Sequence, residues 1–283
     1  MYPWKRKDGS VHLQEITNEG VTYLCFPSLS ETGMVRHGFS TRMGGVSKGP
    51  YATMNFSFTR GDDPEAVREN YRRMARALGV DEKRMVLTWQ THTTNVRRVT
   101  AEDEGKGITK ERDYRDVDGL ITDCPGVTLV TFFADCVPLY FLDRKRKAIG
   151  LSHSGWRGTA NRMGQVTLNR MEQEFGTCPE DVICCIGPSI CQDCYEVGED
   201  VISQFSQAFP EPLHDRLFYR KDNGKYQLNL WEANRQVLLS AGVPEHQIFV
   251  TDICTHCNPD LLFSHRTSPE KRGNLCAFLC LNE

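Results

Sequence analysis

Short apolar runs rich in β-branched residues recur along most of this chain, and they constrain its fold more than any other feature. The runs are VRHGFST, MVLTWQTH, NVRRV, VDGLIT, VTLVTFF, PLYFL, KAIGLSH, DVICCI, IFVTDIC and LCAFLC. Several are continuously apolar over about four to eight residues, which is typical of strands covered on both faces. The sequence therefore predicts extensive β-sheet with little solvent-exposed sheet surface.

Four segments have the apolar periodicity of helices. The first covers residues 62–79, where Asp63 can cap, Pro64 suits the first helical position and Gly79 ends the helix. The other three are expected from near Thr159 to Gly176, from about Glu199, and over residues 228–242. Because these helices form three clusters and do not alternate with the strands, an α+β layered fold is favoured over a doubly wound one. No linker or repeat divides the chain, so we expect one domain over residues 1–283.

Composition and charge exclude several classes of protein. The chain has 39% hydrophobic and 25% charged residues and a formal net charge of -3, as in a globular protein without a nucleic-acid footprint. The densest basic run, residues 144–147, lies between two strand-like segments and is predicted to be a hairpin turn. No apolar run approaches the roughly 18 residues of a membrane span, and the first ten residues are not a secretory signal. We therefore expect a cytoplasmic protein whose twelve cysteines are thiols or metal ligands.

Three residues of metal-ligand type follow strand-like runs. His92, Cys136 and His153 could converge on one pocket wall, and zinc in catalytic sites commonly has three such protein ligands. The alternatives are that Cys136 is a small buried residue and that each histidine is a hydrogen-bonded structural residue. The spacing of the three residues does not decide between these interpretations.

Two C-x-x-C pairs offer a rival metal site with four thiolates, Cys191 with Cys194 and Cys254 with Cys257. The second pair begins 60 residues after the first ends, whereas compact zinc modules separate their pairs by roughly 12 to 20. Sites that join distant parts of a fold do exist, so a structural zinc stays open. A thioredoxin-like role is not favoured, because the first pair does not open a helix after a strand.

Two glycine-rich stretches suggest an anionic ligand. After His153 the chain reads SGWRGTANR, where Gly155 and Gly158 free the backbone and Arg157 adds a fork of donors. The stretch GFSTRMGGVSKGPYATMNFS offers Arg42 and Asn55 in the same way. Each stretch is equally typical of a loop that needs tight turns. The P-loop spacing is absent from both.

The order of motifs resembles that of a known family. HGFSTRMGGVS, WQTH, DGLITD, ADCVPLYF, HSGWRGT, IGPSICQDCYEVG and a later CT occur in succession between residues 37 and 255. This succession closely resembles the YfiH-like proteins, also called polyphenol-oxidase or laccase-domain proteins. The resemblance implies a layered α/β/β/α sandwich with mixed sheets, and a purine nucleoside phosphorylase with adenosine deaminase activity.

The resemblance also assigns residues. The family's Gln-x-His, Ala-Asp-Cys and H-x-G-W-R-G motifs place its metal ligands at His92, Cys136 and His153, and its Ser-Thr-Arg motif makes Arg42 a substrate or phosphate contact. Three positions depart from the common pattern: Thr93 and Ser154, which follow the two ligand histidines, and His265 in Phe-Ser-His-Arg. Of these, His265 is expected to matter most, by changing substrate preference or adding a titratable group near the pocket.

The implied reaction is phosphorolysis of adenosine, inosine, guanosine or methylthioadenosine, with a purine nucleoside and phosphate as the small-molecule partners. Arg42, Arg157 and the backbone of residues 155–158 would bind phosphate or substrate. Adenosine would be deaminated by zinc-hydroxide attack. Asp135 would then shuttle a proton, or orient a ligand histidine, and Gln90 would bind base or sugar.

Other activities stay open beside this one. Zinc is the expected metal, but imidazole and thiolate also bind copper, which would suit a polyphenol oxidase. Against that activity, the chain has only eight histidines and no H-x-H motif for a multicopper cluster. Hydrolysis of a peptidoglycan-precursor amide would use the same metal chemistry. A zinc with four protein ligands would indicate a binding or scaffolding domain instead of an enzyme. The sequence gives no oligomeric state.

Overall fold

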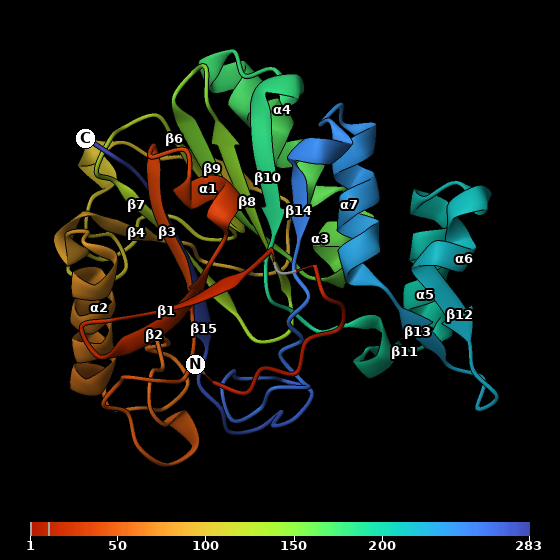
Figure 1. The fold of residues 1–283 in the computed structure, drawn as a ribbon, viewed down its shortest axis with the longest axis horizontal. Helices are drawn as coiled ribbons and strands as arrows, with labels where there is room; N and C mark the ends of the chain where they lie inside the picture. Colours follow the sequence, from red (N-terminus) through yellow and green to blue (C-terminus); the bar gives the residue numbers. More distant parts are fainter. Residues whose placement is uncertain (1, 11) are drawn as a thin grey trace.

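The computed structural model describes residues 2–10 and 12–283, so Met1 of the N-terminal segment considered above and Val11 lie outside it. Two six-stranded sheets lie face to face, and helices cover the outer face of each (Figure 1). The predicted α+β fold with an α/β/β/α layer order and mixed sheets is confirmed. All ten predicted strand segments contain a strand.

The first sheet has the strand order β1-β2-β3-β15-β7-β4. Neighbouring strands are antiparallel except β4 and β7, which are parallel. In this order the strands are β1 (Gln14–Asn18), β2 (Val21–Cys25), β3 (Val35–Ser40), β15 (Leu275–Leu281), β7 (Thr128–Phe133) and β4 (Met85–Leu87).

The second sheet has the order β14-β10-β8-β9-β6-β5, antiparallel inside and parallel at both edges. Its strands are β14 (Ile248–Val250), β10 (Val182–Ile186), β8 (Val137–Asp143), β9 (Ala148–Ser154), β6 (Gly119–Thr122) and β5 (Val96–Arg98). Strands β8 and β9 form a hairpin in which Asp143 faces Ala148. The basic run at 144–147 is therefore the turn of this hairpin, as predicted.

Helix α2 (Pro64–Leu78) covers the outer face of the first sheet, and its ends confirm the capping prediction. The Asp63 side chain accepts the Glu65 N–H, Pro64 opens the helix, and Gly79 ends it with a left-handed φ of 68°. The buried face of α2 packs on residues of β2, β7 and β15.

The second sheet is covered by α3 (Trp156–Ala160), α4 (Met163–Phe175) and α7 (Leu230–Ser240). The prediction of one helix from near Thr159 is wrong at its start, because Arg162 has a left-handed φ of 60°. This residue ends the short α3 and redirects the chain into α4, where its Nε donates to Gln165. The periodicity of the apolar residues does not reveal such a single-residue break.

A smaller lobe lies beside α7 (Figure 1). It contains the antiparallel sheet β11-β13-β12 and the helices α5 and α6. Their bounds are β11 (Glu196–Val197), β13 (Tyr226–Leu228), β12 (Phe218–Arg220), α5 (Glu199–Ala208) and α6 (His214–Leu217). Helix α5 begins where the sequence predicted it. The remaining short helices are α1 (Pro27–Ser30) and the 3₁₀ turns Gly49–Tyr51, Glu82–Arg84, Ala101–Asp103, Pro179–Asp181, Gln192–Cys194, Glu211–Leu213 and Glu245–Gln247.

The hydrophobic core is arranged in three layers, one between the sheets and one beneath the helices on each side. The central layer takes Phe39 and Leu279 from the first sheet and Tyr140 and Leu151 from the second. Burial of both sheet faces explains why the strand runs are continuously apolar.

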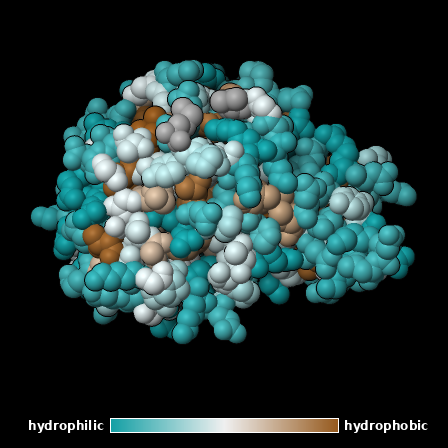
Figure 2. Space-filling view, turned by 60° about the horizontal axis from the view of Figure 1, so that its bottom comes forward, coloured by the Kyte–Doolittle hydropathy of each residue, from teal (hydrophilic) through white to brown (hydrophobic). Residues whose placement is uncertain are grey.

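The surface is mostly hydrophilic. On the face in Figure 2, hydrophobic residues appear as small separate patches. Among the described residues, no helix combines the length and apolar character needed to cross a bilayer.

His37 in β3 is a buried histidine that makes stability depend on pH. Its ring accepts the Phe26 N–H at 2.8 Å, and burial lowers its pKa from 6.5 to about 4. The unfolded chain therefore binds a proton below pH 6.5 that the folded chain takes up only near pH 4. As the pH is lowered from 6.5 to 4, the folded state loses stability relative to the unfolded state. From pH 7.5 to pH 5 this single group should remove about 2 kcal/mol from the free energy of unfolding.

We expect a His37→Gln variant, followed by urea unfolding at both pH values, to lose this part of the pH dependence. A variant with the pH slope of the parent protein would contradict the assignment. Because only the difference between the two proteins is used, titration of other histidines does not enter the comparison.

Candidate functional site

One pocket of about 520 Å³ lies where the ends of β4, β7, β8 and β9 meet. It brings together residues of metal-ligand type, aromatic rings and several cationic side chains. The lining residues are Ser57, Phe58, Thr59, Arg60, Leu87, Thr88, Trp89, Gln90, His92, Gly107, Arg112, Phe132, Phe133, Ala134, Cys136, His153, His265, Arg272 and Asn274. A concave site of this size suits a small-molecule ligand.

His153 lies near the end of β9, and a carboxylate fixes its orientation. Its Nδ1 lies 2.8 Å from Oδ1 of Asp118, the residue just before β6. Donation of Nδ1–H to this carboxylate leaves Nε2 as the atom for a metal ion once its own proton is released, which is the arrangement found in metal-binding histidines. Both side chains are buried, with exposures of 3% and 0%.

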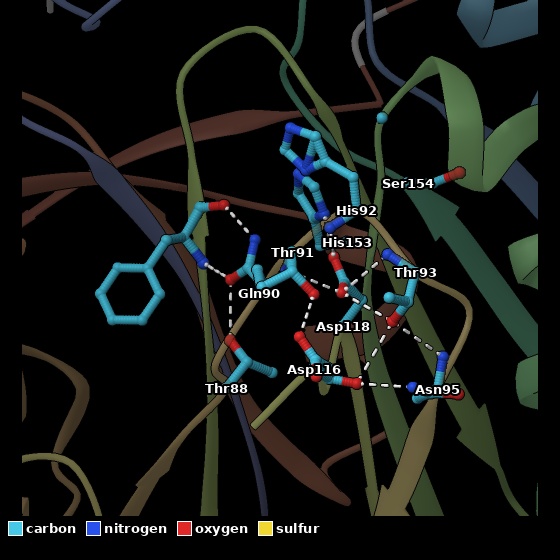
Figure 3. Close-up of polar contacts among 12 residues, drawn as sticks. Thr88, Gln90, Thr91, His92, Thr93, Asn95, Asp116, Asp118, His153 and Ser154 are labelled. Atoms are coloured by element: carbon cyan, nitrogen blue, oxygen red, sulfur yellow. Dashed lines mark hydrogen bonds and ion pairs between the residues drawn. The ribbon is translucent and has the colours of Figure 1, made fainter. Parts of the chain in front are cut away.

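The same carboxylate holds the loop that carries His92. Asp118 accepts the backbone N–H groups of Thr91, His92 and Thr93 at 3.0, 3.1 and 3.0 Å. His92 has a left-handed φ of 66°, and its ring stacks on that of His153 with centroids 4.9 Å apart (Figure 3). Ligand atoms of His92, Asp118 and His153 all lie within 4.8 Å of one another. Strand β4 ends at Leu87, so a left-handed turn and not a strand directs His92 into the pocket.

Cys136 directly precedes β8, and it lines the same pocket as His153. A Cβ at Gly155 would lie 3.1 Å from the Cys136 Sγ and 3.7 Å from Cε1 of His153, so a glycine suits this close approach. Asp135 has a φ of 85°, which turns the chain between β7 and β8. The three residues predicted as ligands therefore lie together in the pocket.

The electrostatics of the cluster suit a bound cation. Burial opposes the charge of His153, but Cys136 and Asp118 outweigh it and raise its pKa to about 9. Burial, followed by the charge of His153, lowers the pKa of His92, so its imidazole is neutral and can act as a ligand. Two imidazoles and a thiolate are donors that zinc prefers, so the residues present fit a zinc ion.

Gln90 lines the pocket, but its amide is used inside the protein. Oε1 accepts the Thr88 hydroxyl at 2.7 Å and the Phe132 N–H at 2.7 Å, and Nε2 donates to the Phe132 carbonyl at 2.8 Å (Figure 3). Gln90 thus attaches the His92 loop to β7. This geometry favours a positioning role over the predicted contact with base or sugar.

The Asp135 carboxylate is also fully engaged. It accepts the Thr255 hydroxyl at 2.6 Å, the Ser264 hydroxyl at 3.1 Å and the Arg266 N–H at 2.7 Å. Its neighbours on both sides line the pocket, whereas Asp135 is not a lining residue. The contact to His153, one of the predicted ligands, is made by Asp118 and not by Asp135. The sequence contained Asp118 in DGLITD, but no local signal marked its role.

The structure does not place Arg42 or Asn55 among the lining residues. Arg42 donates to the carbonyls of Ala52 and Pro259 and lies over the Phe263 ring. Asn55 is buried, and its Oδ1 accepts the N–H groups of Ser57 and Asn274, both of which line the pocket. Asn55 therefore supports the pocket wall from behind.

The turn after His153 is used mainly for packing. Arg157 lies over its neighbour Trp156, with the guanidinium carbon 4.2 Å from the ring centroid, and its charge helps to lower the pKa of His92. A Cβ at Gly158 would lie at an ordinary 3.6 Å from the His153 carbonyl oxygen, so this position does not require glycine for lack of space. Neither residue lines the pocket.

The two small departures from the family pattern both make structural contacts. The hydroxyl of Thr93 lies 3.0 Å from Asp118 and adds to the bonds that hold the His92 loop. The hydroxyl of Ser154 lies 2.9 Å from Asn234 and joins the end of β9 to α7.

Sequence reasoning missed the cationic wall of the pocket. Arg60, Arg112 and Arg272 line it, together with His265. Arg272 is only 6% exposed, and burial followed by the charge of Arg60 lowers its pKa to about 10. Its Nε has no hydrogen-bond partner within the described part of the chain. Arg60 and Arg272 lie outside the conspicuous motifs, and only folding brings them to the metal-ligand cluster.

Both the sequence and the fold are similar to those of known proteins. A purine nucleoside phosphorylase of Bacteroides thetaiotaomicron is 38% identical over 263 residues, which covers 92% of this chain and 96% of the relative. Adenosine deaminase RL5, from an unknown prokaryotic organism, is 34% identical over 81% of this chain and 87% of its own length. The crystal structure of the hypothetical protein YfiH of Bacillus licheniformis superposes with a TM-score of 0.89 at 33% identity, covering 96% of this chain and 100% of that one.

The expected YfiH-like relationship is confirmed, and the curated relatives are enzymes. The family model described as multi-copper polyphenol oxidoreductase laccase matches residues 36–282. The chain belongs to this laccase-like enzyme family, which includes the proteins named purine nucleoside phosphorylase and adenosine deaminase.

Proposed function

We propose that this protein is a zinc-dependent purine nucleoside phosphorylase, which cleaves adenosine, inosine, guanosine or methylthioadenosine with phosphate. One observation carries the proposal: a single cavity holds the His92, Cys136 and His153 cluster and also a wall of arginines. Phosphorolysis needs both a bound anion and stabilisation of charge as the base leaves. The names of the relatives support the same reaction.

The phosphate site is assigned to Arg272 and Arg60. Two like charges are close enough for Arg60 to lower the pKa of Arg272, and the buried Nε of Arg272 lacks a partner. An anion between them would relieve the repulsion and satisfy that donor. His265 adjoins this pair, since the charge of Arg272 helps to lower its pKa.

The nucleoside would occupy the part of the pocket lined by aromatic rings. Phe58, Trp89, Phe132 and Phe133 line it, and Trp89 is 36% exposed at the rim. Flat apolar rings suit a purine base, and the side chain of Asn274 offers a polar contact for the sugar.

His92, Cys136 and His153 would hold the zinc ion, which supplies Lewis-acid activation when bound. Neighbouring residues of the chain control the protonation of the two ligand histidines. Asp118 keeps the proton of His153 on Nδ1, and burial keeps His92 neutral. The fit of the donor set favours zinc, and the same set leaves room for substrate on the open side of the pocket.

Adenosine deamination is a second activity of the same site in this proposal. It is supported by the relative named adenosine deaminase RL5, which is 34% identical over most of both chains. Among residues 2–10 and 12–283, the groups of three or more possible metal ligands are His92 with Asp118 and His153, and one set of four cysteines. A multicopper oxidase needs a further histidine-rich cluster, so we do not propose phenol oxidation. We place the protein in the cytoplasm, where its twelve free thiols would persist.

The decisive test is release of hypoxanthine from inosine by purified protein of known metal content, with and without phosphate. Release that requires phosphate supports the proposal. Release at the same rate without phosphate, or no release from any of the four nucleosides by zinc-loaded protein, would rule out phosphorolysis.

Arg272→Gln tests the phosphate site directly. Removing a charge-assisted contact of about 1.5–3 kcal/mol should raise the KM for phosphate by about 10- to 100-fold. The KM for inosine should change much less, because the nucleoside contacts are retained. Initial rates over a phosphate series give both constants. Arg72→Gln on α2, whose arginine is 45% exposed and remote from the pocket, is the matched control. An unchanged KM for phosphate would contradict the assignment.

A further inference from the structure

Four cysteines that are far apart in the sequence meet at one end of the second sheet. The Sγ atoms of Cys191, Cys194, Cys254 and Cys257 all lie within 4.8 Å of one another. The first two follow β10 and the other two follow β14. Because β10 and β14 are parallel neighbours, their C-terminal ends lie at the same end of the sheet, where the chain leaves both strands. The 60-residue separation of the pairs is therefore spanned by the α5–α7 region, and it does not keep them apart.

The spacing of the sulfurs suits a metal better than disulfides. Zinc–sulfur bonds of about 2.3 Å in a tetrahedron place neighbouring sulfurs about 3.8 Å apart. The sulfurs of Cys194 and Cys257 are 3.5 Å apart, and both cysteines are free thiols, as are the other two. A small contraction around an ion would complete the tetrahedron.

The backbone of the first cysteine loop directs an N–H group at a sulfur of the second loop. The Cys191 N–H donates to the Cys254 Sγ at 3.3 Å. Such bonds stabilise thiolates, which are the form that binds metal.

We propose that these four cysteines form a closed tetrathiolate site for a structural Zn²⁺ ion, separate from the pocket. Four protein sulfurs leave no coordination position for substrate, so the ion stabilises the fold and does not take part in catalysis. Without a dication, charge on more than one of the four clustered sulfurs would be strongly repulsive.

The cluster is linked to the pocket through the turn at Asp135. Ile190, next to Cys191, donates its N–H to the Asp135 carbonyl at 3.0 Å. Thr255, next to Cys254, donates its hydroxyl to the Asp135 carboxylate at 2.6 Å. Both loops that the ion would join therefore hold the residue that precedes Cys136. The ion would keep this turn in place from behind, and the site exists whether or not the proposed reaction is correct.

Metal analysis of the purified full-length chain tests the proposal. We expect Cys194→Ser and Cys257→Ser to lose one equivalent of zinc per chain relative to the parent protein. Both residues are only partly buried, which favours folding of the variants. Cys178→Ser, at an exposed free cysteine outside the cluster, should keep the parent zinc content. Unchanged zinc in the two cluster variants would overturn the proposal.

Cobalt substitution supplies a readout that does not depend on cluster variants. Co²⁺ bound to the His153→Ala chain should still show intense thiolate-to-cobalt charge transfer and tetrahedral ligand-field bands, because the four-cysteine site is intact there. Loss of these bands in His153→Ala would place the metal in the pocket and overturn the proposal. So would non-reducing peptide mapping that finds the four cysteines as disulfides in freshly purified protein. Neither result depends on whether inosine is cleaved.

Discussion

His153→Ala should reduce phosphate-dependent release of hypoxanthine from inosine at least a hundredfold. The substitution removes one proposed ligand, and it leaves the buried Asp118 carboxylate without its imidazole partner. A three-ligand zinc site that loses one ligand no longer holds its ion in an active geometry. The measurement is the steady-state rate at saturating phosphate, together with the zinc content of the same sample.

His246→Ala is the matched control, because His246 is exposed and does not line the proposed substrate pocket. It should retain the parent rate. If His153→Ala keeps more than a tenth of the parent activity, the cluster is not the reaction centre. If it loses activity but keeps the zinc of the pocket, His153 acts in some way other than as a ligand.

Asp118→Asn should weaken metal binding by about 10- to 100-fold, although Asp118 is not one of the three proposed ligands. An amide of the same shape lacks the charge that draws the His153 proton to Nδ1. It can also no longer accept from all of the N–H groups of residues 91–93. Each buried donor left without a partner costs about 1–3 kcal/mol, so the free energy of unfolding should fall by several kcal/mol.

Competition with a chromogenic chelator measures the affinity, and urea unfolding of the metal-free protein measures the stability. Asp116→Asn is the control, since Asp116 is an exposed neighbour that bonds the Thr91 hydroxyl. If Asp118→Asn binds the metal as tightly as Asp116→Asn and is equally stable, the Asp118 carboxylate does not hold the site together.

Local sequence signals were sufficient for most of the secondary structure. Asp63, Pro64 and Gly79 defined the ends of α2, because capping depends on a few adjacent residues. Five of the described strands were not predicted: β1 has a largely exposed pattern, and β11, β12 and β13 have only two or three residues each. Strand β2, with five buried residues, has the pattern of the predicted strands and was missed. The break at Arg162 was not predictable, since a left-handed arginine depends on the tertiary packing of α3 and α4.

Some residues of the candidate site could also be predicted from local sequence, and others could not. Cys136 and His153 are placed by strand ends and by the turn at Asp135, and His92 by a left-handed turn held by Asp118. All three could be proposed from their positions in recognisable motifs. Arg272 and Arg60 are separated by more than two hundred residues and by several elements. Their approach results from the pairing of β15 within the first sheet, which no local pattern specifies.

The position of β15 also bears on how the chain folds during synthesis. This strand is the last described element in chain order, yet it lies inside the first sheet, between β3 and β7. Until residues 275–281 have left the ribosome, β3 and β7 each lack the neighbouring strand with which they pair in the finished sheet. The first sheet is then in two parts, each with an unpaired edge. Such edges promote aggregation, and their closure requires contacts across almost the whole sequence. Completion of this sheet therefore waits until residues 275–281 have left the ribosome, and removal of residues 275–283 should divide the sheet instead of shortening it.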